Sequence, residues 1–236
     1  DRLVAATEGF LETRGIAAHV VGPEGAVATK VAAIRAYGAT LHVCAPTLAA
    51  RDEAAARIAR ETGATLVHPF TNENVIAGQG TAALELLRET GELDVLIAPI
   101  GGGGLIGGSA IAAKGMFPRI RLFAAEPEGA AEAFESLRRG ARVTDLEPDT
   151  ICDGLRATFG EINFALLREY GVEVMPVSDA QTIAAMRLVF ERLKIVIEPS
   201  SAVVLAALLR HRERFANLRV GAIFSGGNVD LDHLPW

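Results

Sequence analysis

The stretch that decides the fold is residues 94–108, which read DVLIAPIGGGGLIGG. Residues 95–100 are apolar and rich in β-branched side chains, as is typical of a buried strand, and four consecutive glycines end this run. Residues 109–116 then form a segment that is compatible with a helix. The order therefore predicts a strand, a tight loop and a helix.

The four glycines leave no side chain between their backbone amides and an approaching ligand. Because these amides converge at the start of a helix, where the dipole favours negative charge, a phosphate group is the expected ligand. The spacing is neither that of a Walker loop, since no Gly-Lys-Ser/Thr follows, nor that of a dinucleotide fingerprint, since the glycines are contiguous. A flexible or closely packed turn is the alternative. The residues predicted to hold the phosphate are Gly101, Gly102, Gly103, Gly104 and Leu105.

Strand-like and helix-like segments alternate along the chain, which predicts an α/β fold with parallel sheets covered by helices. A cluster of Pro, Asn and Thr near residues 70–74 suggests a boundary between a smaller domain, 1–72, and a larger domain, 73–236. The strands are expected at residues 16–21, 40–45, 65–68, 93–100, 119–125, 172–177 and 220–224. The helices are expected at residues 3–13, 28–37, 48–62, 74–90, 109–116, 161–170, 179–193 and 199–211.

Length and charge narrow the classes of function. The chain has 236 residues, of which 50% are hydrophobic, so it can bury a sizeable core in one or two domains. Its net charge of −6, without a basic tract, argues against nucleic acid as a partner. No apolar run approaches the ~20 residues that cross a bilayer, so no membrane association is expected. Two distant cysteines, Cys44 and Cys152, fit a reducing compartment, and we expect a cytoplasmic location.

Polar or glycine-rich features follow three of the expected strands. They are the tetraglycine, the pair Glu126-Pro127 and the Ser-Gly-Gly-Asn turn that begins at Ser225. In a parallel sheet, ligands bind beyond the carboxyl ends of the strands, where these features would meet. The sequence therefore predicts one site at one edge of the sheet.

Several motifs occur in an order that resembles one family. They are HPF at 68–70, IAGQG at 76–80, GGGGLIGG at 101–108, AEP at 125–127, TICDG at 150–154, IEP at 197–199 and SGGNVD at 225–230. From about residue 15 to its end, the chain resembles the threonine/serine dehydratases and serine racemases, which use pyridoxal phosphate (PLP). This resemblance implies the tryptophan-synthase β-type fold (PLP fold type II), with two parallel-sheet α/β domains of which the first is incomplete.

The resemblance implies roles for the residues of the expected site. The glycine loop would hold the cofactor phosphate, and Ser225 would form a hydrogen bond with the pyridine nitrogen. Glu198 would either lie near the cofactor ring or cap the helix that begins at Pro199. The implied reaction is PLP-dependent deamination, by β-elimination, of L-threonine or L-serine to 2-oxobutyrate or pyruvate and ammonia. Phe70 stands where racemases tend to carry Asn, which favours the dehydratases.

The resemblance also implies a cation site at Glu126, Ala130 and Glu132, where relatives bind Mg²⁺ or Ca²⁺. Two carboxylates and a carbonyl oxygen suit a hard cation. Glu132 stands where the family often has Asp, so its carboxylate has a longer reach. The alternative is a solvated acidic helix start, since acidic residues favour that position.

No catalytic residue is assigned in this chain. The family's Schiff-base lysine and its Ser-Ser-Gly-Asn-His motif are expected before or across residues 1–13, and residues 1–14 do not match the family. The chain thus reads as an N-terminally truncated or degenerate member, and we expect it to be inactive alone. The alternatives are a non-catalytic homologue that acts as a phosphate-ligand binding or partner subunit, a serine racemase, and a nucleotide-binding α/β protein. The resemblance implies a small amino-acid substrate and a homodimer.

Overall fold

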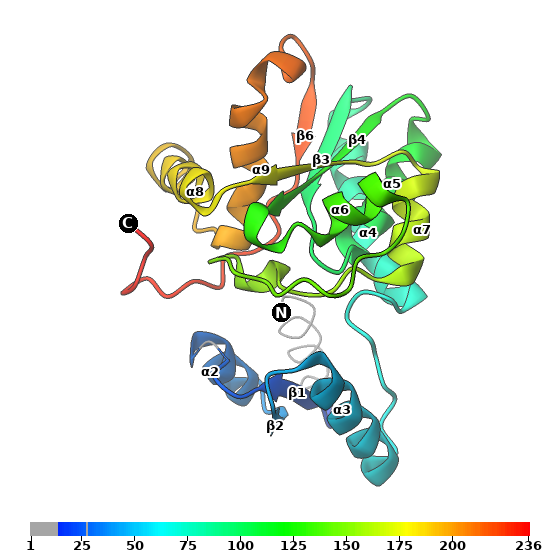
Figure 1. Cartoon of the computed structure of the whole chain (residues 1–236), viewed down its shortest axis with the longest axis vertical. Helices are drawn as coiled ribbons and strands as arrows, with labels where there is room; N and C mark the ends of the chain where they lie inside the picture. Colours follow the sequence, from blue (N-terminus) through cyan, green and yellow to red (C-terminus); the bar gives the residue numbers. More distant parts are fainter. Residues whose placement is uncertain (1–13, 27) are drawn as a thin grey trace. The chain divides into compact units, whose positions relative to one another are not determined.

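The computed structural model of the chain describes residues 14–26 and 28–236 (Figure 1). The chain divides into two compact units, Asp1–Pro69 and Phe70–Trp236. The domain boundary expected from the sequence, between residues 72 and 73, lies close to this division. The helix expected over residues 3–13 lies outside the described residues.

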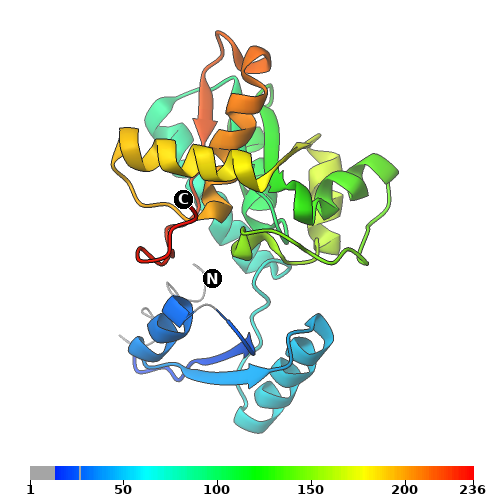
Figure 2. The ribbon, with the colours of Figure 1, turned by 60° about the vertical axis from the view of Figure 1, so that its left-hand side comes forward.

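The smaller unit is a strand–helix–strand element followed by a second helix. Its strands, β1 (His19–Pro23) and β2 (Thr40–Cys44), pair in parallel. Helix α2 (Ala28–Ala36) connects them, and α3 (Leu48–Thr62) follows β2. Figure 2 shows the two paired strands of this unit in shades of blue.

The strand predicted over residues 65–68 is wrong. This stretch has no regular secondary structure, and no strand of the described part of the chain pairs with it. Its two apolar side chains are largely exposed, Leu66 by 55% and Val67 by 53%. A β-branched composition favours an extended backbone, but a strand also needs a neighbour that accepts its hydrogen bonds.

The larger unit is built on one four-stranded parallel sheet. The spatial order of its strands is β5-β4-β3-β6, so β4 and β3 are the two central strands (Figure 1). The bounds of these strands are β3 (Val95–Pro99), β4 (Arg121–Pro127), β5 (Glu173–Val177) and β6 (Val220–Ala222).

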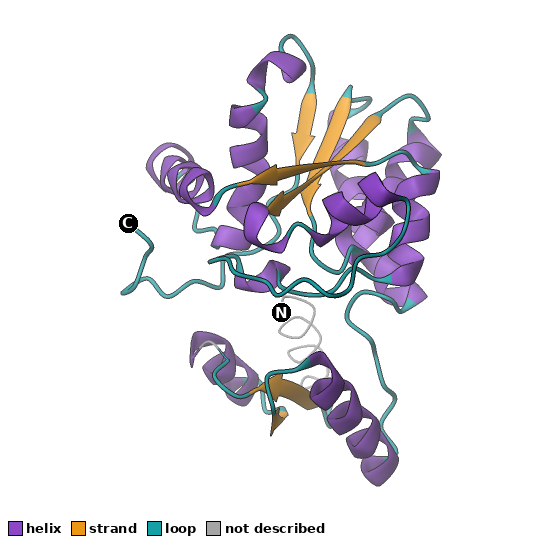
Figure 3. Cartoon of the chain, viewed as in Figure 1, coloured by secondary structure: helices purple, strands orange, loops and turns teal. Residues whose placement is uncertain are grey.

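Helices cover both faces of this sheet (Figure 3). They are α4 (Glu73–Thr90), α5 (Gly104–Met116), α6 (Glu132–Arg139), α7 (Glu161–Glu169), α8 (Asp179–Leu193) and α9 (Pro199–Arg210), with the short 3₁₀ turns η1 (Glu128–Ala130), η2 (Asp153–Leu155) and η3 (Arg212–Phe215). None of the helices in the described ranges is long and apolar enough to cross a membrane.

The alternation of side chains along β3 divides the core into two layers. Leu96 and Ala98 point to the face that packs against α4, α5 and α7. Val95 and Ile97 point to the opposite face, which packs against α8 and α9. Successive side chains of a strand alternate between faces, so a strand buried on both sides reads as one continuous apolar run.

Two helices also differ from the sequence-based expectation. Helix α5 begins at Gly104, five residues before the predicted start at residue 109, because glycine-rich turns belong to the helix itself. Gly108 lies inside this helix, where an added Cβ atom would be only 2.0 Å from the Ile76 carbonyl oxygen of α4. These glycines therefore serve close packing of α4 against α5. Helix α6 was not among the expected helices, although a helix start was considered near its acidic residues.

Candidate functional site

Three adjacent strands direct their carboxyl ends to the same edge of the sheet. The glycine loop follows β3, Glu126 and Pro127 end β4, and Ser225 comes shortly after β6. Because β4 and β6 both pair in parallel with β3, these features meet at one edge (Figure 1). The prediction of a single shared edge is confirmed.

The carbonyl groups of the glycine loop are held by hydrogen bonds from α7, from the residue before α7 and from α5. The Gly102 oxygen accepts from the Gly160 amide at 3.1 Å and from Asn163 Nδ2 at 2.7 Å. The Gly103 oxygen accepts from the Gly107 amide at 2.9 Å, which is the first bond of α5. The loop thus has a fixed conformation and is not a flexible turn.

The amide groups of the loop remain open. Within the described part of the chain, no carbonyl or side chain accepts a hydrogen bond from the amides of residues 101–106. Gly103 is the N-cap residue of α5, with φ of 92°, and it supplies no side chain to cap the helix. Unpaired amides together with the positive end of the helix dipole form a site for an anion.

The other side of the loop is closely packed. An added Cβ atom at Gly102 would lie 2.3 Å from the ring of Phe70. At Gly103 it would lie 2.7 Å from both the Phe159 ring and Asn163 Cβ. The loop is therefore closely packed and also keeps unpaired amides, so the two interpretations of the glycines do not exclude each other.

The position of Glu198 distinguishes between its two expected roles. Glu198 is the N-cap residue of α9, but its side chain forms no capping hydrogen bond. Its Oε2 atom instead accepts from the Asn228 amide at 3.1 Å, and its own amide donates to the Gly226 oxygen at 2.9 Å. Glu198 thus occupies the capping position without a capping bond from its side chain, and that side chain holds the Ser-Gly-Gly-Asn turn. Ser225 is half-buried in this turn.

The 3₁₀ turn η2 links the glycine loop to Glu198. The Gly154 amide donates to Ser200 Oγ at 2.9 Å, and a Cβ atom added to Gly154 would lie 3.4 Å from Glu198 Oε1. On the other side, a Cβ atom added to Gly101 would lie 3.1 Å from Leu155 Cα. The glycine loop, η2 and the Ser225 turn thus form one continuous cluster in the larger unit.

The structure adds residues to the cluster that the sequence did not assign. Ser200 and Asn163 each bond to backbone groups of the cluster, and Phe70 packs against it. Only the glycine that ends the TICDG motif was a signal for η2, because a glycine beside a polar residue marks a turn. No motif in the sequence around Asn163 indicates its hydrogen bond with Gly102.

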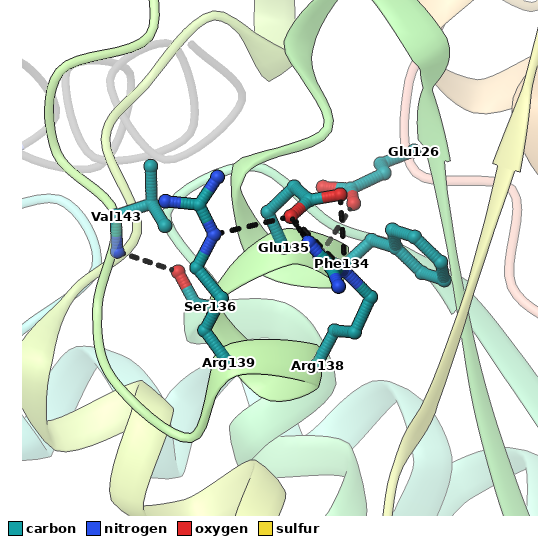
Figure 4. Close-up of polar contacts among 7 residues, drawn as sticks. All are labelled: Glu126, Phe134, Glu135, Ser136, Arg138, Arg139 and Val143. Atoms are coloured by element: carbon teal, nitrogen blue, oxygen red, sulfur yellow. Dashed lines mark hydrogen bonds and ion pairs between the residues drawn. The ribbon is translucent and has the colours of Figure 1, made fainter.

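Glu126 caps helix α6 from a distance. Its carboxylate accepts from the Ala133 amide at 3.2 Å and from the Phe134 amide at 2.7 Å (Figure 4). These are amides of the first turn of α6, whose N-cap residue, Ala131, has no side chain that could accept them. Each carboxylate oxygen of Glu126 therefore accepts a hydrogen bond that stabilises the start of α6.

The two acidic residues of the expected cation site are buried. Glu126 is 1% and Glu132 is 8% exposed, so the alternative of a solvated acidic helix start is wrong. Burial raises the pKa of Glu126 to about 8, although its two amide hydrogen bonds oppose this shift. Burial likewise raises the pKa of Glu132 to about 7, against a hydrogen bond from the Phe159 amide.

The structure does not support the cation site as predicted. No group of three or more His, Cys, Asp or Glu side chains among the described residues could hold a metal ion. The expected set has only two carboxylates, Glu126 and Glu132, with the Ala130 carbonyl as the third ligand. The raised pKa values indicate that a nearby positive charge would stabilise the ionised pair. A cation therefore remains a proposal for experiment.

The buried carboxyl group of Glu126 is expected to make stability depend on pH. The folded protein keeps this group protonated up to about pH 8, whereas the unfolded chain releases the proton near pH 4.5. The free energy of unfolding should therefore fall as pH rises between these values, by up to roughly 5 kcal/mol from this group. Denaturant unfolding of the wild type and Glu126→Gln at several pH values measures the difference, since glutamine resembles the protonated acid.

Glu135→Gln is the matched control, because Glu135 lies on α6, the helix that Glu126 caps, but its pKa is lowered by a hydrogen bond from Arg138. Equal pH dependence in wild type and Glu126→Gln would contradict the prediction. Repeating the series at pH 8 with millimolar MgCl₂ or CaCl₂ tests the cation. Stabilisation of the wild type but not of Glu126→Gln supports a cation, and no stabilisation excludes one at this concentration.

A family model described as pyridoxal-phosphate dependent enzyme matches residues 4–226. Because the match begins at residue 4, the expectation that residues 1–14 differ from the family is wrong for most of that stretch. The chain is 43% identical over 223 residues to the β-hydroxyaspartate dehydratase of Paracoccus denitrificans, an alignment that covers 94% of this chain and 71% of the dehydratase.

Solved structures show the same likeness. The structure of maize serine racemase is 40% identical, with a TM-score of 0.92 over 97% of this chain and 71% of the racemase. The structure of a threonine deaminase from T.th. is 39% identical, with a TM-score of 0.89 over 97% of this chain and 75% of the deaminase. The fold is therefore the tryptophan-synthase β type, as expected from the sequence. With a family model that matches almost its whole length, the chain belongs to the family of pyridoxal-phosphate dependent enzymes.

Proposed function

We propose that the glycine loop binds the phosphate of PLP and that the site serves the deamination of a small β-hydroxy amino acid. One observation carries this proposal. The amides of residues 101–106 are unpaired within the described part of the chain and stand at the start of α5. A phosphate dianion satisfies such amides and interacts favourably with the helix dipole.

The other residues of the cluster suit the remainder of the cofactor. When bound, PLP withdraws electrons from the α-carbon of an amino acid. We propose that Ser225 donates or accepts a hydrogen bond at the ring nitrogen. A hydroxyl group does not force this nitrogen to carry a proton, as a carboxylate would, so the ring withdraws electrons less strongly. Glu198 supports Ser225, because it holds the same turn through the Asn228 amide.

The relatives suggest the class of substrate. Their names refer to β-hydroxyaspartate, serine and threonine, which all carry a hydroxyl group on the β-carbon. We propose β-elimination of that hydroxyl group, which yields a 2-oxo acid and ammonia, with L-threonine and L-serine as the first candidates. Racemisation of serine is the second candidate, since maize serine racemase is as similar to this chain as the deaminase is.

An assay of products should separate these reactions. The chain alone is expected to release no ammonia from L-threonine, L-serine or L-threo-3-hydroxyaspartate with PLP, because none of its three lysines is expected to act as the Schiff-base lysine. If the reading frame upstream of residue 1 encodes that lysine and a Ser-Ser-Gly-Asn-His motif, the protein from the whole frame should release ammonia from at least one of them.

D-serine formed faster than pyruvate would favour the racemase. Failure of that protein with all three substrates would favour the non-catalytic alternative, a subunit that binds a phosphate ligand or a partner. Ser225→Ala, compared in the same assay, should lower the rate without abolishing PLP binding. We also propose a homodimer in the cytoplasm, and sedimentation of the purified protein tests the assembly.

A further inference from the structure

The side-chain amide of Asn163 joins the glycine loop to the first residue of the larger unit. Asn163 is the third residue of α7 and is fully buried. Its Nδ2 atom donates one hydrogen bond to the Gly102 oxygen and another to the Phe70 oxygen, both at 2.7 Å. Both hydrogens of the amide are thus used on backbone carbonyl groups.

These bonds determine the direction of a peptide group in the loop. The Gly102 carbonyl and the Gly103 amide belong to the same planar peptide, and in a trans peptide they point in opposite directions. Because the Gly102 oxygen is directed toward Asn163 and Gly160, the Gly103 amide is directed away from α7. This amide is one of those without a partner in the described part of the chain.

Packing alone does not account for an asparagine at this position. The Oδ1 atom of Asn163 is buried and has no hydrogen-bond partner among the described residues. A buried acceptor without a partner destabilises the folded state by about 1–3 kcal/mol, which an apolar side chain of similar size would avoid. The polar side chain is therefore explained by what Nδ2 does for the loop.

On the basis of the proposed function, we infer that Asn163 is a positioning residue for phosphate binding. By directing the Gly102 carbonyl toward α7, it keeps the Gly103 amide available to the phosphate. It also holds the backbone of Phe70, whose ring packs against Gly102. The inferred effect is specific to the phosphate group of the ligand and does not extend to its ring.

The experiment compares two ligands that differ only in the phosphate. PLP and pyridoxal are titrated into the wild type and into Asn163→Leu. Leucine has a size similar to that of asparagine but no hydrogen-bond donor in its side chain. We expect the dissociation constant for PLP to rise at least tenfold, or about 1.4 kcal/mol, and that for pyridoxal to stay unchanged. Ser136→Ala is the matched control, since it also loses a buried hydrogen bond, from the Val143 amide at 2.9 Å (Figure 4).

Each result decides between separate conclusions. If the wild type binds PLP no more tightly than pyridoxal, the proposed phosphate site fails, whatever Asn163 does. If the wild type prefers PLP and Asn163→Leu keeps the full preference, the inference about Asn163 is wrong. An equal loss of the preference for PLP in Ser136→Ala would show that lower stability alone weakens PLP binding, and the inference would be wrong. If neither Asn163→Leu nor Asn163→Ala folds, Asn163 is a structural residue only and the inference is also wrong.

Discussion

Replacing Gly103 with alanine is expected to weaken PLP binding about 100-fold, which corresponds to ~2.7 kcal/mol. Gly103 has φ of 92°, a conformation that is strained for any residue with a Cβ atom. The new Cβ atom would also lie 2.7 Å from the Phe159 ring and from Asn163 Cβ, so the loop must move away from α7. Its amides would then no longer converge on one anion.

Gly140→Ala provides a matched control for backbone strain. Gly140 ends α6 with φ of 70°, and an added Cβ atom there meets nothing within 4 Å. Both variants should lose about 1 kcal/mol of stability from the left-handed conformation, but only Gly103→Ala should lose PLP. Fluorescence titration with PLP measures the affinity. Unchanged affinity in Gly103→Ala would disprove the phosphate assignment of this loop.

Local signals in the sequence were sufficient for the long helices. Helix α8 has the predicted bounds because Ser178 and Gln181 form a reciprocal capping box at its start. Helix α3 also has the predicted bounds, with Thr47 accepting the Ala50 amide at its start and Gly63 in a left-handed conformation at its end. Caps of this kind lie within three residues of the helix end, so a reader of the sequence can recognise them.

Helix α6 shows where local signals stop. It has only eight residues, and the group that caps its first turn is Glu126, which lies seven residues before Ala133 and on a strand. The sequence indicated acidic residues near a helix start, but it could not indicate that Glu126 would be buried and directed at backbone amides. The bend of the chain between β4 and α6 decides this contact.

The candidate site likewise has one part that could be predicted from consecutive residues and another that depends on contacts between distant residues. The glycine loop could be predicted because its chemistry depends on consecutive residues that share one strand–helix turn. The contact of Asn163 with Gly102 spans 61 residues, and that of Glu198 with Asn228 spans 30. Such contacts depend on how α7 and α9 pack on the sheet, which no short pattern records. The family resemblance supplied Ser225 and Glu198 as candidates, but not the hydrogen bonds that relate them.

None of the three lysines of the chain is expected to bond PLP covalently. Lys114 lies ten residues after Gly104 on α5, at ~15 Å along the axis from the proposed phosphate site, and its Nζ atom donates to the Pro118 oxygen at 3.1 Å. Lys194 ends α8 in a left-handed conformation with φ of 59°, where a cation is favoured by the helix dipole. Lys30 lies in the first turn of α2, in the smaller unit.

Borohydride reduction of the chain with PLP, followed by peptide mapping, measures whether any lysine forms a covalent bond with PLP. The expected result is no stoichiometric label on any lysine, while PLP still competes with inorganic phosphate for the chain. Lys114→Arg and Lys194→Arg should bind PLP as the wild type does. A single stoichiometric label, lost when that lysine is changed to arginine and accompanied by ammonia release from L-threonine, would overturn the prediction. Covalent catalysis requires a neutral lysine amine beside the aldehyde of PLP while the phosphate of PLP stays at the start of α5. Such a label would therefore identify the lysine that meets both conditions.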